Sequence, residues 1–436
     1  MIDFNHASTL IRQCNSFKYS GRVQMITGLT VEADGPAVQI GEMCRIYTLS
    51  RDSYMPAEVV GFKDKRILLM PYGDLTGVGP GSQVVSTNRT LRVMVGDCLR
   101  GRIIDGLGNP IDEGPPISAG DSYPLENAPP NPLTRPIIDE IMPLGVRAID
   151  GLLTCGRGQR VGIFAGSGVG KSTLLGMIAR NAKSDINVIT LIGERGREVN
   201  SFLQNDLGKE GLQRSVVVVA SSDQPALVRV KSAQVATSIA EFFRDSGLNV
   251  LLMMDSLTRY AMAQREVGMA VGEPPVSRGY TPSVYTMMPK LLERAGTSPK
   301  GSITGLYTVL VEGDDLNEPI TDTARSILDG HIVLSRQLAN RNHYPAIDVL
   351  ASVSRLMPEI VTKEHYQKSG KIKGMMAVHK DSQDLINIGA YKSGSNPEID
   401  SSIALNKPLE KFLQQEVGDQ TPFDETLNGL FSLIKN

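Results

Sequence analysis

The sequence has no C-x-x-C pair, and its four cysteines are scattered at Cys14, Cys44, Cys98 and Cys155. A structural zinc site needs closely spaced thiolate or imidazole ligands, so this scatter argues against a zinc cage. The five histidines show no ligand spacing either. Scattered cysteines are typical of thiols that stay reduced in a reducing compartment.

The chain also lacks an excess of charge and a long apolar run. It has 45 basic and 47 acidic residues, for a net charge of -2. No global basic surplus points to nucleic acid or to an anionic membrane, although a local patch would still be compatible with either. No stretch approaches the roughly 18 apolar residues of a membrane span, and residues 1–16 do not form a secretory signal. The sequence therefore predicts a cytoplasmic protein with at most peripheral membrane contact.

A length of 436 residues predicts two or three domains. Between residues 19 and 90, short strands are separated by turn signals, which is typical of a small barrel or sandwich. These strands are predicted at residues 22–26, 38–47, 57–62 and 66–71. Residues 109–136 are dense in proline and predict extended chain that wraps the next domain.

From residue 159 onward, continuous apolar runs alternate with helical stretches. The runs are residues 161–165, 188–192, 216–220, 250–254 and 303–311, and helices are predicted at 171–181 and 226–245. This alternation indicates an α/β core with a mainly parallel sheet covered on both faces. After about residue 360 the chain reads as helical, at residues 363–379, 408–415 and 425–435.

A phosphate-binding loop follows the first of these runs. It has Ala165 where the strict pattern has glycine, but a strand precedes it and a helix follows it, which favours a P-loop over a glycine-rich turn without a ligand. We expect Lys171 to reach the β and γ phosphates and the Ser172 hydroxyl to bind Mg²⁺. The predicted nucleotide-binding residues are Gly166, Ser167, Gly168, Val169, Gly170, Lys171, Ser172 and Thr173.

Two acids follow other strands of the predicted sheet. Asp255 ends an apolar strand, as does the Mg²⁺-associated aspartate of P-loop enzymes. Glu194 follows the strand that ends at Ile192, and the carboxyl ends of parallel strands meet at the ligand crevice. Glu194 is therefore placed to polarise a water near the γ-phosphate. The alternative is a solvated turn with internal ion pairs.

At these residues the chain resembles a known family. The order GSGVGKST, LIGERGRE, LLMMDS and YPAIDVLASVSR is similar to the hexameric ATPases related to rotary ATP synthase. Within that group it most resembles the type III secretion export ATPases, and among these the flagellum-specific ones. The resemblance runs from about residue 19 to the C-terminus. It implies a docking segment at 1–18, a β-barrel at 19–90, a RecA-like ATPase domain at 91–360 and a helical domain at 361–436.

The resemblance also implies roles for single residues. Glu194 would be the catalytic carboxylate, with Asp255 beside Mg²⁺ and Arg195, Glu198 and Arg259 supporting them. Tyr344 would stack on the adenine of ATP, although a core tyrosine beside Pro345 is the alternative. Arg355 would be an arginine finger that reaches the γ-phosphate bound to a neighbouring subunit. Considered without the family, Arg355 reads as a surface or ion-paired arginine.

Glu194 and Arg355 lie on one chain, so one polypeptide carries both halves of a shared site. This predicts a closed ring of identical subunits, in this family a homo-hexamer. The family further implies a stator-like regulator, a central stalk protein, export-gate membrane proteins, and chaperones with their cargo. An apolar stripe in residues 2–14 is the expected docking helix for the regulator, with a disordered tail as the alternative.

Several alternatives stay open at this stage. The C-terminal domain lacks the acidic run of a rotary catalytic subunit, which favours export over ATP synthesis. A virulence-associated export ATPase shares most of the motifs. An RNA translocase would need a basic barrel surface with stacking aromatics, and here the charge is mixed. A ring subunit that binds nucleotide without hydrolysing it would not need both Lys171 and Glu194.

Overall fold

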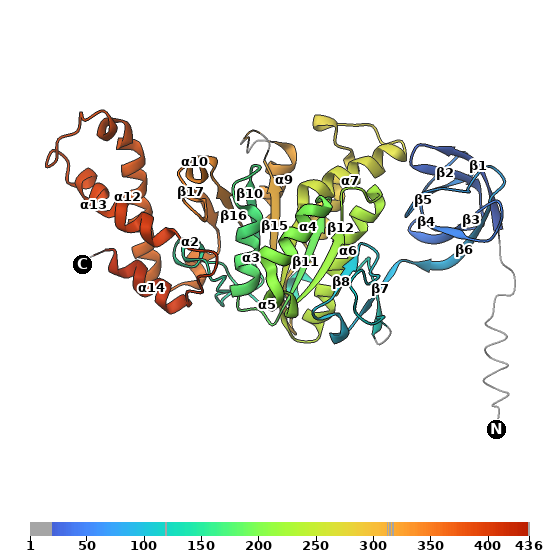
Figure 1. Cartoon of the computed structure of the whole chain (residues 1–436), viewed down its shortest axis with the longest axis horizontal. Helices are drawn as coiled ribbons and strands as arrows, with labels where there is room; N and C mark the ends of the chain where they lie inside the picture. The colour runs from blue at the N-terminus through green and yellow to red at the C-terminus, as the bar shows by residue number, and fades with distance from the viewer. Residues whose placement is uncertain (1–19, 118–119, 312, 314, 316–317, 435–436) are drawn as a thin grey trace, which may run out of the picture.

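The computed structural model describes residues 20–117, 120–311, 313, 315 and 318–434. These residues form three parts in a row: a β-barrel at one end, a central α/β domain and a group of helices at the other end (Figure 1). The predicted fold class is confirmed. The expected docking helix at residues 2–14 lies outside the described residues. Within the described part of the chain, no helix is long and apolar enough to span a membrane.

The N-terminal part is a closed six-stranded barrel in the order β1-β2-β5-β4-β3-β6. Its strands are β1 (Ser20–Thr27), β2 (Thr30–Asp34), β3 (Glu42–Tyr47), β4 (Tyr54–Lys63), β5 (Arg66–Pro71) and β6 (Gln83–Thr90). The sequence did not predict β2 or β6, and the strand predicted from residue 38 begins only at Glu42. The reason is a turn in which the Gln39 amide donates to the Glu42 carboxylate at 3.1 Å.

The central sheet has the strand order β17-β16-β10-β15-β13-β11-β12-β8. Its strands are β8 (Ile103–Asp105), β10 (Arg160–Ala165), β11 (Ile186–Ile192), β12 (Ser215–Ala220), β13 (Asn249–Asp255), β15 (Ser302–Leu310), β16 (Gly330–Leu334) and β17 (Ile347–Ser354), and β14 (Gly296–Thr297) pairs with β15. All pairs are parallel except β16 with β17 and β14 with β15. Neither β16 nor β17 was predicted, because both alternate in burial and lack a continuous apolar run.

Helices cover both faces of this sheet, as predicted. One face carries α2 (Arg147–Leu152), α3 (Lys171–Asn181), α4 (Gly196–Ser201), a π-helical turn (Phe202–Leu207) and α5 (Gly208–Gln213). The other carries α6 (Ala226–Asp245), α7 (Leu257–Ala270), α8 (Pro282–Leu292) and α9 (Pro319–Ile327), while α10 (Arg336–Asn340) precedes β17. Along β11, Val188 packs in one apolar core and Ile189 in the other. This is what alternating side chains of a fully buried strand require.

The C-terminal helices are α11 (Met357–Ile360), α12 (Lys363–Asn387), α13 (Pro397–Leu413) and α14 (Phe423–Ser432). The helix predicted at residues 408–415 overlaps only the end of α13, and residues 414 and 415 lie beyond it. The helix begins earlier because the Asn396 side chain accepts from the Glu398 and Ile399 amides, and Pro397 occupies the first turn. Pro408 therefore lies inside the helix.

The proline-rich segment wraps the central domain, as its composition predicts. Strand β9 (Asp121–Pro124) pairs with β7 (Arg92–Val95), and the chain then runs across α6. The Leu125 carbonyl accepts from buried Arg294, and the Asn127 amide donates to Glu241 at 2.7 Å. The chain thus follows the surface of the central domain before it reaches α2.

A buried ion pair fixes the barrel to α6. The Lys231 ammonium lies 2.8 Å from Glu58 Oε1, and both side chains are less than a tenth exposed. The Tyr72 hydroxyl donates to the other oxygen of Glu58. Burial, followed by the charge of Glu58, raises the pKa of Tyr72 well above its usual value. Because both side chains of the Lys231–Glu58 pair are buried, water cannot take the place of either one if it is removed.

We expect Lys231→Ala to destabilise the protein by about 3–5 kcal/mol, because it leaves Glu58 buried without its cation. Differential scanning calorimetry would measure this as a lower melting temperature. The matched control is Lys380→Ala, which breaks a 4.0 Å pair between an exposed lysine and Asp348 and should cost less than about 1 kcal/mol. Equal melting temperatures for the two variants would contradict the assignment of Lys231 as a domain anchor.

Candidate active site

The loop after β10 has the backbone of a phosphate cradle. Gly168 and Gly170 have left-handed φ values of 77° and 88°, which favour glycine. Gly170 stands at the N-cap of α3, and no side chain of a described residue caps that end. The first amides of α3 are therefore open to an anion, and the helix dipole favours negative charge there. Val169 packs into the core and holds the loop in place.

Lys171 and Asp255 meet at the end of the sheet. The Lys171 ammonium contacts Asp255 Oδ1, and the Thr308 hydroxyl donates to the same oxygen at 2.6 Å. Asp255 is buried because β13 lies between β11 and β15. The aspartate is thus held rigidly beside the phosphate loop, with its second oxygen not used in these two contacts. Ser172 follows Lys171 in the first turn of α3 and lines the same cavity.

Glu194 also lies close to Lys171. Its Oε1 is 3.5 Å from the Lys171 ammonium and 3.6 Å from Arg259 Nε. Burial raises the pKa of Glu194 to about 7, and the charge of Asp255 adds to this rise, whereas Lys171 lowers the pKa. A carboxylate that titrates near neutral pH is suited to accept a proton.

The other charged residues of the LIGERGRE segment surround Glu194. Glu198, at the start of α4, shares a hydrogen bond with Glu194, and this bond lowers the pKa of Glu198. Arg195 lies 3.8 Å from Glu198, but its side chain is 77% exposed. Gly193 has a left-handed φ of 67°, and a Cβ there would lie 2.8 Å from Arg259. Glycine therefore lets Arg259 approach the Glu194 loop closely.

Two cavities meet at the phosphate loop. One, of about 680 Å³, is lined by the loop itself and by Glu194, Asp255 and Arg259. The other, of about 1160 Å³, lies between α3, the loop around Tyr344 and the segment that follows α13. Thr173 lines both cavities. A ligand with a charged and a flat, partly apolar end could occupy the two together.

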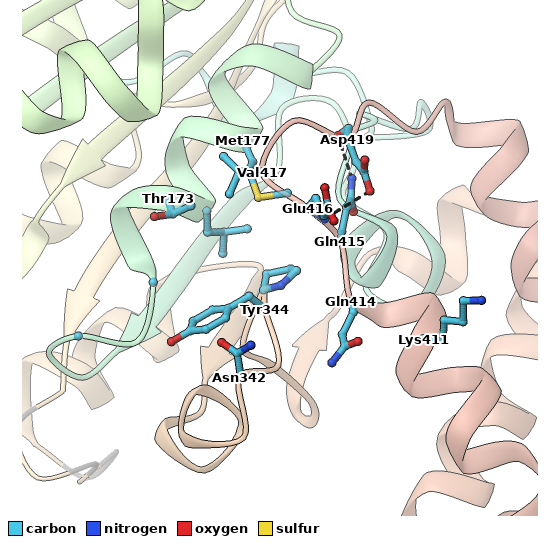
Figure 2. Close-up of a pocket in the computed structure, with 14 residues that line it drawn as sticks. Thr173, Met177, Asn342, Tyr344, Lys411, Gln414, Gln415, Glu416, Val417 and Asp419 are labelled. Atoms are coloured by element: carbon cyan, nitrogen blue, oxygen red, sulfur yellow. Dashed lines mark hydrogen bonds between the residues drawn. The ribbon is translucent and has the colours of Figure 1, made fainter.

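Tyr344 forms one wall of the larger cavity (Figure 2). Its side chain is 40% exposed, and a Cβ on Gly170 would lie 3.3 Å from the ring, so the ring lies against the phosphate loop. Tyr344 is therefore not a core residue. Met177 of α3 and Val417 line the cavity as well, and Figure 2 shows them near one another across from Asn342.

Arg355 does not join this site. Ser354 pairs with Gly330, and His331 pairs with Gly162, so Arg355 lies level with the start of β10. The phosphate loop follows the other end of that strand, and six residues of strand span about 20 Å. The Arg355 side chain is exposed and donates to the Arg325 carbonyl at 3.1 Å. Within one chain it cannot touch a bound phosphate.

The sequence did not reveal two further parts of the site. Thr308 lies within an apolar run, and only the pairing of β13 with β15 places it beside Asp255. The segment 414–419 closes the larger cavity from the C-terminal domain. Gln415 holds it there, because its amide nitrogen donates to the Tyr344 carbonyl and its side chain donates to Gly145. These two contacts join residues that are 71 and 270 positions apart in the sequence, and no motif signals either of them.

Three family models match successive parts of the chain. The model of the ATP synthase alpha/beta family nucleotide-binding domain matches residues 145–354, and the beta-barrel domain of that family matches residues 23–88. The T3SS EscN ATPase C-terminal domain matches residues 361–432. The fold and the site thus define a P-loop ATPase of the ATP synthase alpha/beta type.

Relatives of similar sequence show to which branch of this class of ATPases the chain belongs. A flagellum-specific ATP synthase of Bacillus subtilis is 54% identical over 98% of both chains, and a type 3 secretion system ATPase of Xanthomonas euvesicatoria is 48% identical over 95% of this chain and 93% of its own. The structure of the assembled ATPase EscN of enteropathogenic E. coli has a TM-score of 0.89 and 48% identity, covering 95% of this chain and 99% of that one. The chain belongs to the family of type III secretion export ATPases, which includes the flagellum-specific ones.

Proposed function

We propose that the chain forms a homo-hexameric ring that hydrolyses ATP with Mg²⁺ and energises flagellar-type protein export. The observation that carries this proposal is the meeting of Lys171, Glu194 and Asp255 at one cavity, with Arg355 on a separate face. In the ring, each subunit would bind ATP between its own phosphate loop and the Arg355 face of its neighbour. Head-to-tail contacts of identical subunits close into a ring when the rotation permits.

The residues fit the nucleotide and its metal. Residues 166–173 would hold the phosphates through backbone amides, and Lys171 would balance the charge of the β and γ phosphates. Ser172 and Asp255 would hold Mg²⁺, which screens charge on the phosphates when bound. The buried carboxylate of Asp255 beside an open helix N-terminus supports this assignment.

Glu194 would orient the attacking water and accept its proton. Its position 3.5 Å from the Lys171 ammonium and its raised pKa support this role. Arg259, Arg195 and Glu198 would keep the carboxylate oriented. Tyr344 would stack on the adenine in the larger cavity, where Met177 and Val417 supply apolar surface.

Arg355 would stabilise the charge that develops on the γ-phosphate of the adjacent subunit. Support comes from its exposure and from its place at the sheet edge remote from its own phosphate loop. One relative, EscN, was solved both assembled and in complex with its central stalk EscO. We propose a corresponding stalk partner here, together with a stator-like regulator, export-gate membrane proteins and export chaperones with their cargo.

A flagellar system is preferred because flagellum-specific relatives reach 54% identity over 98% of this chain and 50% over 97%, whereas type III secretion ATPases reach 48% over 95% and 54% over only 79%. The difference is small, so the virulence-associated system remains the second candidate. Peripheral association with a membrane-embedded export apparatus from the cytoplasm is part of the same proposal. In the host, loss of flagellar filament export on deletion of the gene would support the first candidate. Intact flagella with loss of effector secretion would support the second.

Phosphate release from MgATP by the purified full chain tests the enzymatic part. We expect Lys171→Ala to lower kcat/KM by on the order of 10²–10³, because a positioned donor to the developing charge is lost. The matched control is Lys183→Ala, an exposed lysine two residues after α3, which should leave the rate unchanged. Full turnover by Lys171→Ala would mean that the phosphate loop is not the hydrolytic site.

A further inference from the structure

The face that carries Arg355 has a second unusual feature. Leu133 is 94% exposed and Ile137 is 81% exposed, and both belong to the proline-rich segment before α2. Of the large apolar side chains among the described residues, these are the two most exposed. Single exposed apolar residues need no explanation, but two on one short segment that is held in place can mark an interaction site.

The segment is held firmly against the central domain. Arg135, between the two apolar residues, donates to the Ala295 carbonyl at 3.0 Å and to the Glu293 carbonyl. The Thr297 hydroxyl donates to the Pro136 carbonyl at 2.7 Å. Leu133 lies in a short 3₁₀ turn, and its amide donates to the Asn131 side chain at 3.0 Å. Folding therefore already holds this segment in one conformation. A partner that binds it would not have to order it, which lowers the entropic cost of binding.

Ile137 borders the same hollow as the residue that follows Arg355. Ile137, Leu356 and Asp329 line a surface cavity of about 220 Å³, and Leu356 is the residue after Arg355. The Arg355 amide donates to the Asp329 carbonyl at 3.1 Å. Any body that covers Arg355 closely must therefore also come close to Ile137.

The charge of this face indicates what covers it. Arg325 and Arg355 both lower the pKa of His331, in addition to the larger effect of its burial, so two cations lie close together here. The phosphate cavity carries the carboxylates Glu194, Glu198 and Asp255 together with the cations Lys171, Arg195, Arg259 and Arg336, and the bound nucleotide would give it a negative charge. A second copy of the chain with its nucleotide bound would thus present opposite charge to this face.

We propose that Leu133 and Ile137 form an apolar contact with a second copy of the chain, beside the contact that Arg355 makes with that copy's phosphate site. This inference rests on the proposed ring. The apolar pair would supply binding energy through burial of its side chains, and Arg355 would supply positive charge at the γ-phosphate. The proline segment is therefore an assembly element as well as a connection between domains.

Photo-crosslinking and sedimentation velocity test the contact directly. A photoreactive phenylalanine analogue at position 133 is placed in the full chain and irradiated with Mg²⁺ and a slowly hydrolysed ATP analogue. We expect covalent dimers whose crosslinked peptide in the second copy lies beside its phosphate cavity. The same analogue at position 388, a 75% exposed isoleucine just after α12, is the matched control and should give no such peptide.

The substitution arm combines Leu133→Asp with Ile137→Asp. Both side chains lie in solvent, so the melting temperature of the isolated subunit should be unchanged. The concentration for half-maximal ring assembly should rise at least about tenfold, since burial of each side chain is worth that much or more. Ile388→Asp should leave it unchanged.

The proposed contact would be overturned if rings form without a crosslink from position 133. It would also be overturned if the double variant assembles at the same concentration as the wild type. Neither result would contradict the ring itself. A wild-type chain that stays monomeric at every concentration and hydrolyses ATP without Arg355 would overturn the ring itself, and the contact with it.

Discussion

Arg355→Ala is expected to lower the rate of ATP hydrolysis by roughly 10³-fold or more, the contribution typical of an arginine that stabilises a transferring phosphoryl group. The loss should appear in kcat, because Arg355 lies about 20 Å along β10 from its own phosphate loop and does not contribute to the cavity there. Steady-state phosphate release at saturating MgATP measures it. Arg89→Ala, which removes an exposed arginine of the barrel, is the matched control and should be silent.

Mixing two inactive variants tests whether Arg355 acts between subunits. Arg355→Ala keeps Glu194, and Glu194→Gln keeps Arg355, so some interfaces of a mixed ring regain both groups. With random assembly of equal amounts, about a quarter of the interfaces do so. Activity should therefore return in part on mixing. If co-assembly is demonstrated and no activity returns, or if Arg355→Ala alone is fully active, Arg355 is not a finger in trans.

The second large effect concerns Glu194 and pH. Burial, reinforced by the charge of Asp255, raises the pKa of Glu194 from 4.5 to about 7 against the opposing effect of Lys171. A base that works only when ionised should make kcat/KM fall tenfold per pH unit below about 7. Glu194→Gln should lower kcat by on the order of 10²–10⁴ and leave no such acid limb. Rate measurements between pH 5 and pH 9 at constant ionic strength would show both.

Glu198→Gln provides the control for this pH profile. The protonated Glu194 carboxyl donates a hydrogen bond to the Glu198 carboxylate, and this bond is one of the contributions that raise the pKa of Glu194. Replacing that carboxylate by a neutral amide should therefore move the acid limb to lower pH without removing it. A limb that persists in Glu194→Gln would assign the titration to another group.

The same pKa shift makes the stability of the folded protein depend on pH. Between its usual pKa of 4.5 and the folded value of about 7, Glu194 keeps a proton in the folded protein that the unfolded chain has lost. Its contribution to stability is therefore fully present below 4.5 and is lost as the pH rises through about 7. Glu194→Gln should remove this pH dependence, which melting temperatures at pH 5 and pH 8 would reveal.

Much of the site could be predicted because its chemistry is local in sequence. A phosphate loop needs closely spaced glycines, a lysine and a hydroxyl between a strand and a helix, and these stand together at residues 166–173. Asp255 and Glu194 could be placed because each follows an apolar strand and parallel strands end at a common edge. The three-part fold was likewise evident from short strands, then apolar runs alternating with helices, then helices alone.

Strand pairing and the contacts between distant segments needed the tertiary structure. Strands β16 and β17 carry no continuous apolar run, so only their pairing beside β10 makes them part of the sheet. That pairing sets Arg355 at the edge of the sheet away from its own phosphate loop. Burial of apolar surface brings Thr308 to Asp255 and Gln415 to Tyr344, and no spacing along the chain encodes either contact.

The chemistry of the phosphate site was thus determined by consecutive residues, because a loop of eight residues cradles a phosphate with its own backbone. The packing of the sheet decided which groups close that site. It also decided which face of the chain is left exposed to complete the site of a second copy. The physical reason is that packing minimises exposed apolar surface over the whole chain and does not depend on separation in sequence. Leu133, Ile137 and Arg355 remain exposed because no other part of the chain that the structure describes packs over them.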